Sequence, residues 1–277
     1  MAREFIMEDG GRVLVLSAEE GMVVHMARGE CVIGVMDGCV PPPLPSGCYL
    51  VEEEESVDAD FAGRVYARFC HKPWIIGENE RLTLREFAAE DIAELYRLEQ
   101  GMRKHKDLHG ILGEIPDTPW AELPEAERDE LTARLASYIE HQYAFYEYGL
   151  WGVYYKPEGK LIGMCGFSTT EEVDMSLGYY IFPTYRRYGY ATQACRMALD
   201  FVKEWQQAEE VYALIDWENL ASQSVAMTLG FVQTTRDGDV LHFRKTLCEK
   251  PMQPEPKDSA ALFDKLKTFA GKYFRRE

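Results

Sequence analysis

The 277-residue chain has no run of 18 or more apolar residues, so we expect no transmembrane helix. No basic segment precedes an apolar stretch near its beginning, which speaks against a secretory signal peptide. The seven cysteines are odd in number and never spaced C-x-x-C, which argues against a disulfide framework and a zinc site. These absences predict a cytoplasmic protein with no metal and no membrane partner.

Positive charge is also scarce, because 30 lysines and arginines face 47 acidic residues and the net charge is −17. Nucleic acid needs a basic surface, so we expect no nucleic-acid partner. An acidic field attracts a cationic amine substrate, although the solubility of a cytosolic protein explains the same charge. With 46% hydrophobic residues, the chain can bury the core of one large domain or two small ones.

The most informative stretch is Gly178–Arg196, which reads GYYIFPTYRRYGYATQACR. An apolar strand ends there, and a helix begins near Thr192. Gly189 and the small Ala191 let a ligand approach the backbone closely. The first amides of a helix have no intrahelical acceptor and favour an anion, for which a pyrophosphate is the expected guest. An ordinary strand–turn–helix is the alternative, and these residues alone do not decide between the two.

The hexapeptide Arg186–Ala191 fits the R/Q-x-x-G-x-G/A pattern of the GNAT acetyltransferases, whose backbone amides hold the pyrophosphate of acetyl-CoA. The resemblance continues in order on both sides of the hexapeptide and covers about Glu80–Leu247. Its further signals are an opening strand and helix (Arg81–Glu90, then Asp91–Tyr96), a hairpin (Trp151–Tyr155 and Leu161–Ser168), a fifth strand (Val211–Ile215), and N-x-x-S and L-G-F motifs (Asn219–Ser222, Leu229–Phe231). The last two resemble the ribosomal-protein N-terminal acetyltransferase branch.

The resemblance implies an α/β fold with a mixed central sheet and helices on both faces, and acetyl-CoA as co-substrate. It implies that Ile181 and Phe182 bind the pantetheine arm through their backbone, and that Asn219 and Ser222 contact the other side of the cofactor. The residues implied for the pyrophosphate loop are Arg186, Arg187, Tyr188, Gly189, Tyr190, Ala191 and Thr192.

The acid and base of the family cannot be carried over to this chain. Relatives often have a glutamate where Ser176 stands, and many have a tyrosine where Ala226 stands. Asp174 and Glu172 are the candidate catalytic carboxylates that remain nearby, although a carboxylate at a strand end is commonly only a surface group. We therefore predict that no single side chain carries the proton transfer.

Asp174→Asn is accordingly expected to lower turnover by less than ~100-fold, the lower end of what a positioned general base contributes. Steady-state rates across pH check this, because the profile should follow deprotonation of the substrate amine. A loss of several thousandfold together with the acidic limb would identify Asp174 as a true base.

Residues 1–75 lie outside this resemblance and predict a small α/β domain before the acetyltransferase domain at 76–248. Two short apolar runs, Val13–Leu16 and Cys31–Val35, flank a predicted helix at Glu19–Arg28, as in a βαβ unit. Arg12–Ser56 is weakly similar to a haloacid-dehalogenase-type phosphatase. The nucleophile motif D-x-D-x-T is missing, so the unit is expected to be a remnant without phosphatase chemistry.

An insertion at Gly101–Gly149 separates the first helix from the hairpin and ends in a predicted helix, Glu125–Tyr148, dense in aromatic residues. In GNAT proteins this segment forms one wall of the acceptor pocket. Two or three of these rings are expected to reach that pocket, while the others belong to the core.

The C-terminal part, 249–277, reads as a proline-rich linker (Lys250–Ser259) followed by an amphipathic helix (Ala260–Phe274). Its apolar stripe needs a cover. The N-terminal unit is the first candidate for that cover, and a second subunit, forming a homodimer, is the other.

Two functions are compatible with these patterns. The first is acetyl-CoA-dependent N-acetyl transfer to a primary amine of a small molecule or of a protein N-terminus. The second is a non-catalytic module that binds acyl-CoA. The cofactor loop is common to both, and release of free CoA in the presence of amines distinguishes them.

Overall fold

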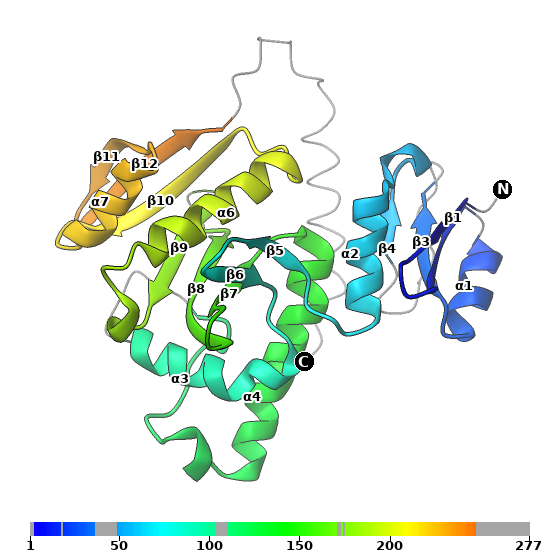
Figure 1. Ribbon diagram of the computed structural model, residues 1–277, viewed down its shortest axis with the longest axis horizontal. Helices are drawn as coiled ribbons and strands as arrows, with labels where there is room; N and C mark the ends of the chain where they lie inside the picture. Colours follow the sequence, from blue (N-terminus) through cyan, green and yellow to red (C-terminus); the bar gives the residue numbers. More distant parts are fainter. Residues whose placement is uncertain are drawn as a thin grey trace.

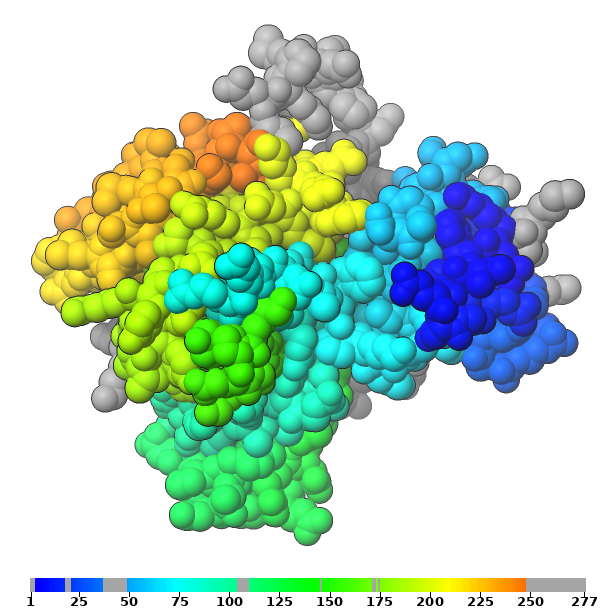
Figure 2. All heavy atoms as spheres, in the orientation of Figure 1, coloured from blue at the N-terminus to red at the C-terminus, as the bar shows by residue number. Residues whose placement is uncertain are grey.

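The computed structural model describes residues 3–17, 19–36, 49–103, 110–170, 173 and 175–247. They form two separate sheets, a four-stranded one in the order β1-β2-β3-β4 and an eight-stranded one in the order β11-β12-β10-β9-β8-β7-β6-β5 (Figure 1). In the space-filling view the first sheet forms a lobe beside the larger body (Figure 2). Each sheet has its own hydrophobic core.

The smaller sheet and helix α2 make up what we call the N-terminal unit, residues 3–69. Its elements are β1 (Arg3–Ile6), β2 (Arg12–Leu16), α1 (Glu19–Ala27), β3 (Cys31–Val35), β4 (Tyr49–Val51), the 3₁₀ turn η1 (Glu54–Ser56) and α2 (Ala59–Phe69). Strands β2, β3 and β4 are parallel, as the two buried apolar runs predicted. Strand β1 was missed, because it is a mostly exposed antiparallel edge without apolar alternation.

The larger sheet is mixed, as predicted, because β10 runs parallel to β9 while the other neighbours are antiparallel. Strand β5, which the sequence analysis did not predict, extends it beyond the opening strand β6. Its strands are β5 (Ile75–Glu78), β6 (Leu82–Arg85), β7 (Leu150–Tyr155), β8 (Lys160–Ser168), β9 (Ser176–Ile181), β10 (Glu210–Asp216), β11 (Val232–Asp237) and β12 (Val240–Thr246).

Helices cover both faces of this sheet, which confirms the predicted architecture (Figure 1). Strand alternation divides the core, since Ile181 packs with α6 while its neighbour Tyr180 packs with α3 and α4. The helices and short turns are η2 (Ala89–Asp91), α3 (Ile92–Met102), η3 (Trp120–Glu122), α4 (Glu125–Tyr138), η4 (Ile139–Tyr143), α5 (Ala144–Tyr146), η5 (Pro183–Tyr185), α6 (Tyr190–Glu204) and α7 (Leu220–Thr228).

The insertion between α3 and β7 is helical where predicted, but α4 does not continue as an α-helix to Tyr148. It changes into the π-helical turn η4 before the short α5. The wider turn brings Tyr143 fully into the core, where its hydroxyl donates to the carbonyl of Leu150 at 2.6 Å and accepts from the Phe87 amide at 3.3 Å. These bonds favour the π turn over regular continuation.

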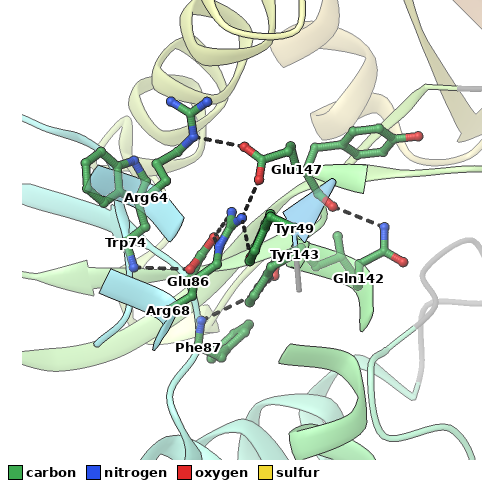
Figure 3. Close-up of polar contacts among 11 residues, drawn as sticks. Tyr49, Arg64, Arg68, Trp74, Glu86, Phe87, Gln142, Tyr143 and Glu147 are labelled. Atoms are coloured by element: carbon green, nitrogen blue, oxygen red, sulfur yellow. Dashed lines mark hydrogen bonds and ion pairs between the residues drawn. The ribbon is translucent and has the colours of Figure 1, made fainter. Parts of the chain in front are cut away.

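A buried ionic cluster joins the N-terminal unit to the larger sheet (Figure 3). Arg68 of α2 contacts Glu86 at 2.6 Å and Glu147 at 2.5 Å, and Arg64 contacts Glu147 at 2.9 Å. Glu86 also accepts the Trp74 amide at 3.2 Å. Because these side chains are almost entirely buried, each charge depends on its partners for the solvation that it has lost.

Glu99 of α3 is a second buried acid, and it has no basic partner among the interactions of the described residues. Its carboxylate accepts the backbone amides of Ile111 at 2.5 Å and Leu112 at 3.2 Å. Burial raises the pKa of Glu99 to about 7, even though the two amide hydrogen bonds act in the opposite direction. The folded protein therefore holds a proton on Glu99 at pH values where the unfolded chain has lost it.

The free energy of unfolding should consequently fall as pH rises from 5 to 8, by on the order of 2 kcal/mol from Glu99. The sign follows because Glu99 is protonated in both the folded and the unfolded protein at low pH. As pH rises, the unfolded chain loses this proton first, so the folded state loses relative stability until pH passes the pKa of Glu99 in the folded protein. Glu99→Gln should flatten this part of the profile, as measured by urea unfolding at each pH. Glu94→Gln, on the same helix, is the control. An unchanged slope in Glu99→Gln would contradict the assignment.

Candidate active site

The predicted anion loop lies between β9 and α6. Gly189 is the residue that caps the N-terminus of α6, with a φ of +79°, and Arg187 is also left-handed at +68°. The first regular helical bond runs from the Gln193 amide to the Gly189 carbonyl at 3.1 Å. The amides of the preceding residues, Tyr190, Ala191 and Thr192, therefore have no acceptor within the helix and can bind an anion.

Arginines surround this loop, although the chain as a whole is strongly acidic. Arg186 donates through Nε to the Ile181 carbonyl at 2.8 Å, and Arg187 is exposed. Arg81, which the sequence analysis did not single out, reaches the Tyr188 carbonyl at 3.3 Å and stacks over the Tyr190 ring at 4.4 Å. Arg81 directly precedes β6 and is 107 positions from Tyr188, so no local pattern around the loop could have identified it.

Strands β9 and β10 meet at one point only, the parallel pair of Ser176 with Tyr212. The Tyr212 amide donates to the Met175 carbonyl at 2.9 Å, and no later pair joins these two fully described strands. They therefore diverge toward the end of β9 that leads into the anion loop. We call β9 and β10 the splayed strands.

A cavity of about 290 Å³ occupies the divergence. Ser176 and Tyr179 of β9 line it together with Ser222 and Ala226 of α7, and Met102 of α3 reaches it. The Tyr179 hydroxyl donates to Ser222 Oγ at 3.1 Å. A pair of hydroxyls thus stands in the same cavity as Ala226, the position at which many relatives have a tyrosine.

Tyr179 is a site residue that the sequence analysis missed. It alternates with Tyr180, which packs on the opposite face of the sheet. Strand periodicity placed Tyr179 on the same face as Ile181, but only the position of α7 shows that it faces Ser222.

The two residues predicted to contact the pantetheine arm, Ile181 and Phe182, differ in the direction of their backbone groups. Within the β8–β9 ladder, the Phe182 amide donates to the Ile162 carbonyl at 2.9 Å, so it is already used on the side away from the cavity. By alternation, the backbone of Ile181 points toward β10, and its carbonyl accepts from Arg186. Of the two residues, Ile181 is therefore the one whose backbone faces the divergence.

Asn219 caps α7, since its side-chain oxygen accepts the Ser222 amide at 3.1 Å. It fixes the start of the helix that carries Ser222 and Ala226. The N-x-x-S pattern thus has a structural role as a helix cap.

Asp174 and Glu172 lie outside the described residues. Their described neighbours border two cavities, because Thr170 lines the one between β9 and β10, whereas Val173 and Met175 line a second, of about 390 Å³. Of the aromatic rings that the structure describes in the insertion, only Tyr148 reaches this second cavity. None of them lines the first, so the prediction that two or three would do so is wrong. The π turn directs Tyr143 into the core instead.

The sequence model of the acetyltransferase (GNAT) domain matches residues 81–232, more than half of the chain. The chain belongs to the GNAT acetyltransferase family. Its activity is that of an acyltransferase that uses acetyl-CoA. The family domain contains the opening strand, the anion loop, the splayed strands and α7.

The solved structures that are similar to this GNAT chain have low sequence identity to it. The ribosomal-protein-S5-alanine acetyltransferase from Vibrio fischeri is 18% identical, with a TM-score of 0.50, over 63% of this chain and 98% of that one. An acetyltransferase from Agrobacterium tumefaciens is 22% identical, with a TM-score of 0.45, over 61% and 92%. A ribosomal L7/L12 alpha-N-protein acetyltransferase in complex with coenzyme A is 14% identical, with a TM-score of 0.48, over 62% and 98%.

Membrane-spanning helices and metal-binding clusters are both absent from the described residues of this GNAT chain. None of its described helices is both long and apolar enough to cross a bilayer. No group of three or more histidine, cysteine, aspartate or glutamate residues in the described ranges could hold a metal ion.

Proposed function

We propose that this protein transfers the acetyl group of acetyl-CoA to a primary amine of a small molecule or of a protein N-terminus. The observation that carries the proposal is that β9, which diverges from β10 around a cavity, leads directly into the turn and the left-handed helix start at Gly189. A pyrophosphate at the loop would direct an extended thioester arm along β9 toward Tyr179. Such an arrangement holds the two reactants in one place and orients them for attack.

The residues proposed to hold the cofactor are the amides of Tyr190, Ala191 and Thr192, together with the charges of Arg81 and Arg187. The helix dipole and the guanidinium groups both favour the phosphate charge. The backbone of Ile181, which faces the divergence, is proposed to contact the pantetheine arm.

The chemistry requires that the amine nitrogen attack the thioester carbonyl carbon and that the carbon–sulfur bond break. The amine then loses a proton to water, and the leaving thiolate must gain one. We propose that the Tyr179 hydroxyl donates this proton, because it lies in the cavity that Ala226 leaves open and is held by Ser222 at 3.1 Å. Asp174 and Glu172 remain proposed alternatives for accepting the amine proton.

Tyr179→Phe is therefore expected to lower kcat by about 10- to 100-fold, while calorimetry shows an unchanged Kd for acetyl-CoA. The substitution removes the proton donor and leaves the ring in its packing. Tyr66→Phe, which removes a hydroxyl that donates to Asp9 in the N-terminal unit, is the control and should keep full activity. Full activity in Tyr179→Phe would exclude the hydroxyl from the reaction.

The proposed function is tested by measuring free CoA released from acetyl-CoA by the purified protein. The acceptors should include small primary amines and peptides with a free N-terminus, and the same peptides with an acetylated N-terminus serve as the control. Release with free amines only is the expected result. Binding of acetyl-CoA without release for any amine would favour the non-catalytic acyl-CoA module.

A further inference from the structure

A groove of about 770 Å³ runs between the N-terminal unit and the acetyltransferase domain, well separated from the active site. We call it the junction groove. Helix α1 contributes Val23 and Met26, α2 contributes Phe69, and the α4–α5 region contributes Ile139 and Ala144. Arg68 and Glu86, which pair in the buried cluster shown in Figure 3, also line this groove.

The walls of this groove expose apolar side chains that a protein in water normally covers. Val23 is 43% exposed and Phe69 is 45% exposed, on two helices that face the same hollow. A contiguous apolar hollow of this size, with charged residues at its rim, is typical of a surface that binds another apolar element. Its volume also lies in the range of small-ligand pockets, so the occupant has to be decided by other features.

The chain itself supplies an apolar element of the right form. Residues 260–274 place apolar side chains at helical spacing, and such a stripe is stable in water only when something covers it. Its members are Leu262, Phe263, Leu266, Phe269, Ala270 and Tyr273. This segment lies outside the described residues.

Charge also matches the segment to the groove. Residues 260–277 contain five lysines and arginines against two acids, so this end of the chain is net positive although the whole chain carries −17. The groove is lined by Glu90 and Glu140, and also by Glu30, which already contacts His25 at 2.6 Å. Its cations are largely compensated, because Arg68 pairs with Glu86 at 2.6 Å and Lys72 lies 3.6 Å from Asp9.

The connection is long enough. The last described residue, Leu247, donates its amide to the Glu209 carbonyl at 2.7 Å. Glu210, which follows Glu209 in the sequence, lines the cavity of about 390 Å³ together with Tyr148. Tyr148 is four positions after Ala144, which lines the junction groove. The 12 residues from 248 to 259 can span up to about 40 Å when extended, and three prolines favour extension.

We propose that residues 260–274 form a helix that docks in the junction groove of the same chain, with its apolar stripe against α1, α2 and the α4–α5 region. The docked helix covers the exposed Val23 and Phe69 and fastens the N-terminal unit to the acetyltransferase domain. Its flanking lysines then lie beside Glu90 and Glu140 at the rim.

The test places a photo-crosslinking phenylalanine analogue at position 23 in the full chain. Mass spectrometry is expected to find crosslinks to residues 260–274. Mixing ¹⁴N- and ¹⁵N-labelled chains before irradiation separates crosslinks within one chain from those between copies. Crosslinks that join ¹⁴N- to ¹⁵N-peptides as often as peptides of the same label would overturn the proposal in favour of a dimer, and the absence of crosslinks to residues 260–274 would reject that segment as the occupant.

Two variants of the segment decide whether the apolar stripe makes the contact. Leu266→Asp with Phe269→Asp puts charges into the stripe and should lower the crosslink yield at least about tenfold. Thr268→Asp adds a charge on the opposite side of the helix and should keep the yield. Hydrogen exchange in α1 should rise in the first variant and not in the second. Equal yields, or equal losses, in the two variants would contradict docking through the stripe.

Discussion

Gly189→Asp is expected to weaken acetyl-CoA binding at least about 100-fold, or nearly 3 kcal/mol. Gly189 caps α6 with a φ of +79°, so the added carboxylate sits where the phosphate has to approach. The negative charge of the new side chain also repels the phosphate at the start of α6. Any side chain is strained at this left-handed φ, so circular dichroism should show that α6 remains folded before the loss is assigned to binding.

Calorimetric titration with acetyl-CoA measures the effect, and two further variants isolate its cause. Gly189→Asn keeps the side-chain size without the charge, and its loss should be smaller. Gly159→Asp makes the same substitution at a φ of +63° in the β7–β8 turn, where a new Cβ meets no atom within 4 Å, and should bind normally. Binding by Gly189→Asp equal to that of the parent would move the phosphate site elsewhere.

Arg68→Met is expected to lower the free energy of unfolding by about 3–5 kcal/mol. The guanidinium of Arg68 satisfies Glu86 and Glu147, and the side chain of Glu86 is only 2% exposed. Without Arg68 these two carboxylates are buried without their main counter-charge. The free-energy cost of such a buried unpaired charge is larger than the loss from removing an average side-chain contact. The loss should also loosen the N-terminal unit from the larger sheet.

Urea unfolding measures this loss, with Arg236→Met as the control. Arg236 pairs with Asp239 at 3.9 Å on the surface, so its removal should cost at most about 1 kcal/mol. Combining Arg68→Met with Glu86→Gln should recover much of the stability, because the unpaired carboxylate is removed while Glu147 keeps Arg64 as its partner at 2.9 Å. A cost below about 1 kcal/mol for Arg68→Met alone would show that water solvates the cluster.

The anion loop was predictable from sequence because its features are local. A strand, a glycine and a helix start follow one another within a few residues, and the backbone conformation of Gly189 is a property of that short stretch. Strands β2 and β3 were predictable for a similar reason, since short continuous apolar runs indicate buried strands.

The contact of Tyr179, the proposed proton donor, and the arginine beside the anion loop were not predictable in this way. Tyr179 and Ser222 are 43 positions apart, and Arg81 and Tyr188 are 107 apart. The π turn at Ile139–Tyr143 was missed as well, because it depends on hydrogen bonds from Tyr143 to partners outside its own helix.

By itself, the sequence determined the order of the main acetyltransferase elements from β6 to α7 and the position of the turn around Gly189, and the family resemblance added the mixed sheet. Periodicity and turn chemistry depend on residues that are close in sequence, so these elements can be identified from neighbouring positions. Only the tertiary structure decided that Tyr179 faces Ser222 and that Arg68 joins the two parts through Glu86 and Glu147. Those contacts depend on how elements pack across the core, and packing brings together residues whose separation along the chain carries no signal.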